Sequence, residues 1–315
     1  VFKISVNDLF LDESDDPVAV TQAMLESEIP AEIPGKKSRR MNIAAILRRE
    51  TQAVKENERL FEAAAMKHFT DQQAQISSSL GIKAKDDLFS SLADYMLPDG
   101  TFNPELWAML PEAEQIRLAE GIAAGLLDWN TEAEKLAKMF HPLWKKAYDD
   151  GVSISEEGYG IYAVERPEFV SPAKINGGKR IVGIENTTKA RIADIIAKGI
   201  SEGSSQTRLK DAIQSEMGTT KKRAKLIARQ ETMTALATGQ FDMMKAAGAT
   251  TKTWQHRPQK NPRDGTRGPN HVILDGETVG IDERFSNGLR YPKDPEDNRP
   301  EELINCRCYL TYGGF

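Results

Sequence analysis

The sequence predicts a mainly α-helical protein with a small α+β module at its C-terminus. Three observations indicate this fold class. Residues 41–80 contain neither Gly nor Pro and carry one apolar stripe at helical spacing. Helical periodicity returns in several segments up to residue 249. Residues 250–315 are rich in Gly, Pro, Asp, Asn and aromatic residues with short β-prone runs, which is typical of a loop-rich module that contains strands.

The composition excludes several classes of protein. The chain has 315 residues, of which 39% are hydrophobic and 28% charged, with a net charge of −5. No apolar run approaches the roughly 18 residues of a membrane span, so no membrane partner is expected. Two cysteines exclude a disulfide-stapled secreted scaffold and fit a reducing compartment. The chain begins with Val1 rather than Met, which indicates a processed or truncated part of a longer polypeptide.

The first 40 residues are expected to form an extended acidic arm. Residues 1–35 contain eight acidic residues and one basic residue, a net charge of −7, together with three prolines. Such a segment has little capacity to bury itself against a core.

Residues 41–150 are expected to form a helical region that begins with one long helix. A helix over 41–80 would span about 60 Å, which suits a packed bundle or a projecting strut. Gly81 is expected to end it. The apolar residues of its stripe follow one another at intervals of four and seven: Ile43, Leu47, Val54, Phe61, Ala65, Phe69, Ile76 and Leu80.

The remainder of this region is punctuated by turn and cap signals. Pro98–Gly100 predicts a turn, and Asn103 followed by Pro104 predicts a capped helix start. Two further helices are expected over 111–127 and 131–149, the second opened by a capping box.

Residues 151–185 lose the helical period and are expected to form a linker or short strands. Residues 186–249 are expected to be helical again. Asn186–Thr188 predicts a helix start, and a long helix is expected over 219–246, ended by Gly248.

A basic cluster lies at the start of that long helix. Residues 186–247 contain eleven basic and six acidic residues, a net charge of +5. The cluster could bind DNA phosphates or an acidic protein surface. Alternatively it is the solvated face of an amphipathic helix. Its members are Lys221, Lys222, Arg223, Lys225 and Arg229.

Residues 250–315 contain the histidines and cysteines that could bind a metal. His256, His271, Cys306 and Cys308 could in principle form a Cys2His2 zinc site. The C-x-C spacing and the separation of the histidines by fifteen positions argue against zinc. The plainer interpretation is that both thiols lie on one face of a strand, so no metal or cofactor is expected and zinc remains an alternative.

No catalytic residue is expected. His271 and Asp275 could form an acid–base pair, but a histidine in a turn-rich module is more often a structural residue that anchors a loop. The sequence contains no G-x-S-x-G elbow, no P-loop and no G-x-G-x-x-G after a strand.

A series of short strings then occurs in a fixed order: Ile227–Ala235, Gly248–Trp254, Asp264–Arg267, His271–Gly276, Val279, Asp282–Phe285, Tyr291–Asp294 and Asn305–Cys308. This series resembles the phage Mu protein F-like family of minor head, or head-morphogenesis, proteins of tailed bacteriophages. The resemblance is clear over about residues 186–313. Gln230 stands where the family pattern has Thr, and the step from Arg267 to His271 is one residue longer than usual.

The matched residues are interpreted as a structural motif: Arg229, Glu231, Trp254, Asp264, Arg267, His271, Asp275, Gly276, Phe285, Asn305, Cys306 and Cys308. Trp254 and Phe285 are expected to anchor a small core, and Asp275 with Gly276 to form a turn that requires Gly. Arg229 is expected to fasten the C-terminal module by bidentate hydrogen bonds.

The resemblance implies a non-enzymatic minor capsid protein that acts at the portal or the capsid interior during head assembly and DNA packaging. It implies the portal and capsid proteins of the same phage as partners, with packaged DNA as a further one. The protein would be found in the virion, and in the host cytoplasm during assembly. The chain could also be the C-terminal part of a portal fusion.

Two alternatives stay open at this point. One is a virion-delivered enzyme, nuclease-like or transferase-like, that uses His271, Asp275 and Arg267. The other is a DNA-binding module centred on residues 221–229.

Overall fold

The structure is a computed structural model that describes residues 43–82, 89–163, 165–170, 179–217, 220–257, 264–266, 268–297, 299–304 and 306–315. The expected acidic arm over 1–40 lies outside the described residues.

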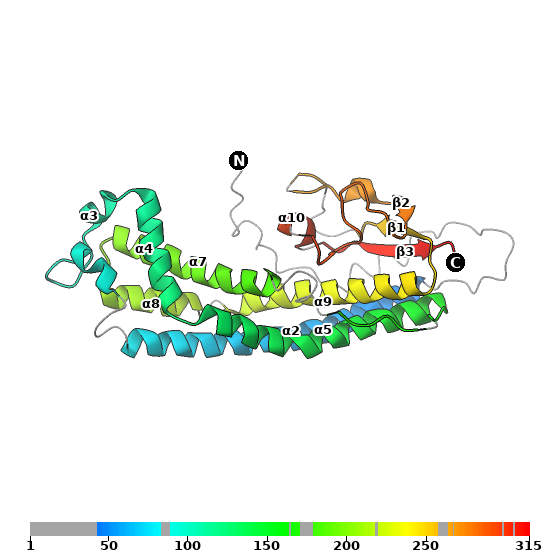
Figure 1. The fold of residues 1–315 in the computed structure, drawn as a ribbon, viewed down its shortest axis with the longest axis horizontal. Coiled ribbons are helices and arrows are strands. Elements are labelled where there is room, and N and C mark those ends of the chain that lie inside the picture. Colours follow the sequence, from blue (N-terminus) through cyan, green and yellow to red (C-terminus); the bar gives the residue numbers. More distant parts are fainter. Residues whose placement is uncertain are drawn as a thin grey trace. The chain divides into compact units, whose positions relative to one another are not determined.

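The fold class is the predicted one: a mainly α-helical chain with a small three-stranded antiparallel sheet near its C-terminus (Figure 1). The elements in chain order are α2 (Ile43–Ile82), η3 (Ser90–Tyr95), α3 (Pro104–Ala108), α4 (Glu112–Gly125), α5 (Trp129–Tyr159), α7 (Lys179–Ser201), α8 (Gln206–Met217), α9 (Thr220–Ala246), β1 (Thr251–Gln255), η4 (Val272–Leu274), β2 (Thr278–Gly280), α10 (Pro300–Leu303) and β3 (Tyr309–Gly313).

The chain divides into two compact units, each assembled from segments that are far apart in the sequence. Among the described residues, unit 1 comprises 43–55, 147–169 and 233–315, and unit 2 comprises 56–146 and 170–232. The long helices α2, α5 and α9 each contribute one segment to either unit.

Unit 2 has an apolar core between α2, α4, α7 and α8 and the short helices η3 and α3. Its buried members are Ile76, Leu80, Phe89, Leu92, Phe102, Trp107, Ala119, Ile122, Ala123, Leu126, Ile192, Ala193, Ile196, Ile200, Leu209 and Ile213. Further along α2, Phe61 packs edge-on against Phe140 of α5 at a centroid distance of 5.1 Å. From Leu47 to Leu80 the predicted stripe is therefore the buried face of α2, with Val54 half-buried, and the helix ends at Ile82, next to the expected stop.

Of the turn and cap signals predicted for unit 2, two are confirmed and one is wrong. Gly100 has φ +81° in the predicted turn, and the Asn103 side chain accepts hydrogen bonds from the first turn of α3. The expected capping box at the start of the second helix is wrong. Asp128 caps α5 instead, because its carboxylate accepts both the backbone N–H and the hydroxyl of Thr131.

The expectation of a linker or short strands over residues 151–185 is wrong at both ends of this range. Helix α5 continues to Tyr159 and α7 already begins at Lys179. Between them, the described residues 160–163 and 165–170 form neither helix nor strand. Residues 186–188 therefore lie inside α7. There the hydroxyls of Thr187 and Thr188 donate to carbonyls four residues earlier instead of capping a helix start.

Glycines hold α5 and α9 together in unit 1. A Cβ added to Gly151 of α5 would meet the backbone of Leu236 at less than 3.0 Å, and one added to Gly239 of α9 would meet the backbone of Tyr148 equally closely. The two helix backbones therefore touch at this crossing. The helical period of the sequence ends at Gly151, because a glycine is needed at this position for the close contact between the two helices.

The three strands form a sheet of order β2-β1-β3, and both pairs are antiparallel. The sheet and its loops lie along the C-terminal part of α9 (Figure 1). Tyr291 stacks on Phe241 of α9 at a centroid distance of 4.6 Å, which attaches the loops after β2 to this helix.

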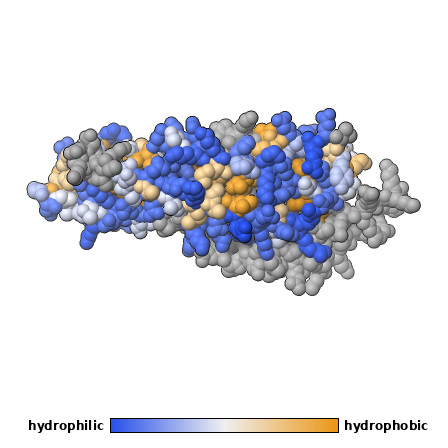
Figure 2. Space-filling view, turned by 90° about the horizontal axis from the view of Figure 1, so that it is seen from below, coloured by the Kyte–Doolittle hydropathy of each residue, from blue (hydrophilic) through white to orange (hydrophobic). Residues whose placement is uncertain are grey.

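The described residues contain no helix long and apolar enough to cross a membrane. Figure 2 shows hydrophilic side chains over most of the face drawn, with apolar side chains in smaller groups between them.

Candidate functional site

The C-terminal module of unit 1 is built around Trp254 of β1, which is completely buried. Phe285 and His271 contact its ring edge-on, at centroid distances of 5.1 and 5.4 Å. The same core contains Leu274, Leu289, Leu303, Cys306 and Cys308. Edge-on aromatic pairs add to the stabilisation that burial provides, so Trp254 and Phe285 lie where a small core needs its anchors.

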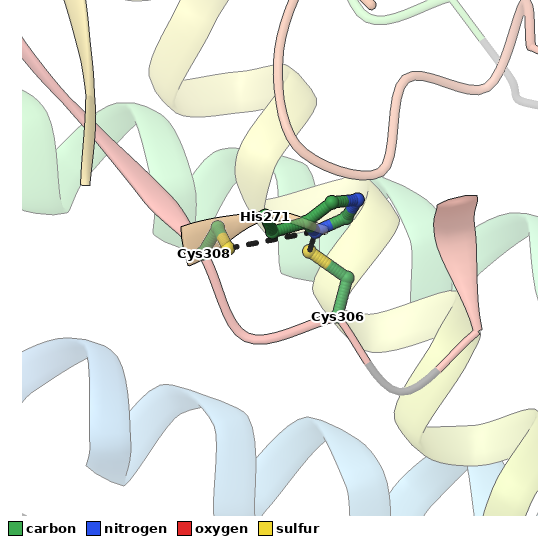
Figure 3. A group of neighbouring side chains, drawn as sticks. All are labelled: His271, Cys306 and Cys308. Carbon is green, nitrogen blue, oxygen red and sulfur yellow. Dashed lines mark hydrogen bonds between the residues drawn. The ribbon is translucent and has the colours of Figure 1, made fainter. Parts of the chain in front are cut away.

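Three side chains that could bind a metal meet beside Trp254. The Nδ1 atom of His271 lies 3.5 Å from the Sγ atom of Cys306 and 3.7 Å from that of Cys308 (Figure 3). His271 directly precedes η4, and the two cysteines directly precede β3. All three side chains are buried, and their ligand atoms lie within 4.8 Å of one another. His256 is not in this group, so the structure brings together three of the four residues of the zinc alternative.

The partner of His271 is Glu302 of α10 and not Asp275, so the acid–base pair of the enzyme alternative does not form. The Nε2 atom of His271 lies 2.7 Å from a carboxylate oxygen of Glu302. The Asn287 amide donates to the same carboxylate at 3.2 Å, and the Arg299 guanidinium lies 3.6 Å from its other oxygen. Asp275 is exposed and accepts the backbone N–H of His256 at 2.8 Å.

The two thiols form a hydrogen-bonded pair with opposite pKa shifts. The hydrogen bond from Cys308, aided by His271 and the positive charge of Lys293, lowers the pKa of Cys306 well below its ordinary value. The same hydrogen bond, together with burial, raises the pKa of Cys308.

The remaining residues of the motif shape the loops. Gly276 has φ +80°, in the left-handed region that favours glycine, as expected for the Asp275–Gly276 turn. Asp264 accepts the backbone N–H and the hydroxyl of Thr266 in a second turn. Arg267 and Asn305 lie outside the described residues.

Arg229 and Glu231 lie on the part of α9 that belongs to unit 2, and each reaches a different partner. Arg229 donates to Glu58 of α2 at 3.3 Å. Glu231 is buried and accepts the indole N–H of Trp144 at 2.9 Å. The expectation that Arg229 fastens the C-terminal module by bidentate hydrogen bonds is therefore wrong, because its partner belongs to a long helix.

The basic cluster at 221–229 does not form one exposed surface. Arg223 is half-buried, donates to the Thr188 hydroxyl at 2.7 Å and lies over the Phe69 ring at 4.7 Å. Burial lowers the pKa of Arg223 to about 10. With Arg229 bound to Glu58, the two arginines connect helices inside unit 2. The lysines at 221, 222 and 225 are exposed.

A second buried group of titratable side chains lies in unit 2. His68 of α2 lies 2.9 Å from a carboxylate oxygen of Glu185 of α7, whose other oxygen accepts the Gln72 amide. Glu132 of α5 is also buried, and Lys135 donates to it at 2.6 Å. The Gln75 amide of α2 also donates to Glu132 at 3.3 Å, so these bonds join α2, α5 and α7, and periodicity alone offered no sign of them.

Sequence reasoning also missed two charged residues of the module. Asp294 is completely buried and accepts two hydrogen bonds from the Arg290 guanidinium, at 2.9 and 2.7 Å. Lys252 of β1 is buried as well; it donates to the Ile281 carbonyl at 2.8 Å and lies over the rings of Phe241 and Phe285. Asp294 ends the motif Tyr291–Asp294, although the sequence gives no sign of its burial, and nothing local distinguishes Lys252.

Part of the chain is similar to a known family. Residues 190–311 match the family described as Phage Mu protein F like protein. The uncharacterized protein YqbB of Bacillus subtilis strain 168 is 31% identical over 132 residues, which cover 38% of this chain and 40% of the relative. The chain thus matches less than half of that relative's length. No solved structure matches the chain.

Proposed function

Because residues 190–311 are a Mu protein F-like region, we propose that the chain is a structural head-morphogenesis protein of a tailed bacteriophage. The family is one of structural phage head proteins. The observation that carries the proposal is the family match over the region that contains α8, α9, β1, β2, most of β3 and the His271–Cys306–Cys308 cluster.

The arrangement of the matched residues supports a structural role over the enzyme alternative. His271 is buried and bonded to Glu302, and Asp275 is bonded to a backbone N–H. Trp254 and Phe285 form the core. These residues hold loops and strands together, and His271 and Asp275 do not form the acid–base pair on which the enzyme alternative depended.

The proposal extends to partners and location. The portal and capsid proteins of the same phage are the proposed partners, with the portal vertex or the capsid interior of the virion as the location and the host cytoplasm as the place of assembly. A position in the C-terminal part of a portal fusion fits the same role.

Packaged DNA is included as a further partner, through the exposed lysines at 221, 222 and 225. Three phosphate contacts would give a logarithmic salt slope of at most about −3, since each contact contributes about −0.9. Binding of the full chain to duplex DNA should therefore weaken only moderately with salt. Binding that is absent at low salt, or that does not respond to salt, removes DNA from the proposal.

The proposal is tested with a phage whose copy of this chain carries an amber mutation. We expect heads made without the chain to be defective in assembly or packaging, and wild-type heads to contain a fixed number of copies by quantitative mass spectrometry. Complementation with Asp275→Asn, which removes the acidic member of the suggested pair, should restore normal heads. Purified heads that contain no copy of the chain, with normal assembly in its absence, would refute the proposal.

A further inference from the structure

The buried cluster of His271, Cys306 and Cys308 places both of its sulfur atoms near one imidazole nitrogen. One nitrogen, Nδ1 of His271, faces two sulfur atoms at nearly equal distances of 3.5 and 3.7 Å (Figure 3). A neutral imidazole nitrogen of this kind accepts one hydrogen bond. The two sulfur atoms and the nitrogen instead occupy three positions around a common centre, as the ligands of a tetrahedral metal ion do.

The distances fit a tetrahedral metal centre. With Zn–S bonds of about 2.3 Å and Zn–N bonds of about 2.05 Å, two ligands of a tetrahedral zinc ion lie roughly 3.6 Å apart for a sulfur–nitrogen pair and roughly 3.8 Å apart for a sulfur–sulfur pair. The two measured sulfur–nitrogen distances bracket the first value. All three ligand atoms also lie within 4.8 Å of one another, close enough to share one ion.

Neighbouring side chains orient His271 so that its Nδ1 atom can bind a metal ion. Its Nε2 atom lies 2.7 Å from the Glu302 carboxylate, which accepts the N–H there and leaves the Nδ1 lone pair directed at the sulfurs. Asn287 and Arg299 hold the carboxylate in turn. Histidines that bind metals in proteins characteristically donate their other N–H to a carboxylate in this way.

We propose that His271, Cys306 and Cys308 bind one zinc ion through Nδ1 and two thiolates. Two thiolates and an imidazole form a soft donor set that suits zinc, and both thiol protons leave on binding. The ion would join the loop before η4 to the segment before β3, across a module whose apolar core is small. This site is independent of the proposed role in the phage head.

The metal content of the full chain tests the proposal. The protein is purified under reducing conditions from cells supplied with zinc, and its metals are counted by mass spectrometry. We expect about one zinc per chain. The variants Cys306→Ser and His271→Ala should each lose the ion. His141→Ala, which removes an exposed histidine of α5, should retain it.

A cobalt titration of the wild-type chain keeps the test independent of how the variants fold. Cobalt(II) bound by two thiolates gives an intense sulfur-to-cobalt charge-transfer band in the near ultraviolet, and added zinc should abolish it. A wild-type chain that carries less than about 0.1 zinc and shows no such band would overturn the proposal. His256→Ala should keep both signals. If that variant loses the ion as completely as Cys306→Ser does, the three-residue site is wrong and the four-residue set is correct.

Discussion

The contact between α5 and α9 makes a strong prediction, because it depends on the absence of two side chains. Replacing Gly151 or Gly239 with Ala places a Cβ within 3.0 Å of the backbone of the opposite helix. A backbone cannot rotate away as a side chain can, so the helices must separate. Overpacking of this kind costs about 1–3 kcal/mol, and the rigidity of both partners favours the upper end. The higher helix propensity of alanine stabilises the helix by about 1 kcal/mol, so the free energy of unfolding should fall by about 2 kcal/mol in total.

The matched control is Gly121→Ala in α4, where an added Cβ meets nothing within 4 Å. That variant should be more stable than wild type by about 0.5–1 kcal/mol. The free energies of unfolding are measured by urea denaturation followed by circular dichroism. The double variant Gly151→Ala/Gly239→Ala should be less destabilised than the sum of the single variants, because both act at one crossing. Equal stability of Gly151→Ala and Gly121→Ala would refute the close approach of the two helices.

Three further predictions concern buried polar groups. Trp144→Phe removes the donor to Glu231 and should lower the free energy of unfolding by about 1–3 kcal/mol, with little further loss on adding Glu231→Gln; additive losses in a double-mutant cycle would contradict the pairing. Burial lowers the pKa of Lys252 to about 8 from 10.5, so between these values the unfolded chain binds more protons and stability should rise with pH. Lys252→Met should remove this contribution, and an unchanged pH profile between 8 and 10 would argue against the burial. Arg290→Ala leaves the buried Asp294 carboxylate without its guanidinium and should cost about 3–5 kcal/mol in thermal unfolding; a variant as stable as wild type would show that water reaches Asp294.

The sequence was informative where a local rule decides the structure. The apolar stripe of 41–80 could be predicted because an amphipathic helix must bury its apolar face. The start of α3 could be predicted because Asn103 and Pro104 form an N-terminal cap from residues adjacent in sequence. The end of α5 could not be predicted in this way. Gly151 weakens a helix in isolation, and only the backbone of α9 explains why the chain remains helical there.

The same distinction applies to the site. The C-x-C spacing predicted that the thiols of Cys306 and Cys308 lie on one face of a strand. They do lie together and are buried, but both residues precede β3. Glu302 could not be identified as the partner of His271, since the two residues are 31 positions apart and the alternative partner Asp275 lies much nearer in sequence. The arginines of the basic cluster were misleading for a related reason: a count of charges does not show that Arg223 and Arg229 are already engaged with other helices.

The central claim is that this chain is a structural part of a phage head, and a cryo-electron microscopy map of purified heads tests it most directly. The account predicts density at the portal vertex or on the inner capsid surface into which the helices of unit 2 and the sheet-containing module of unit 1 can each be fitted. This density should be missing from heads assembled without the chain. Identical maps from heads made with and without the chain would contradict the claim.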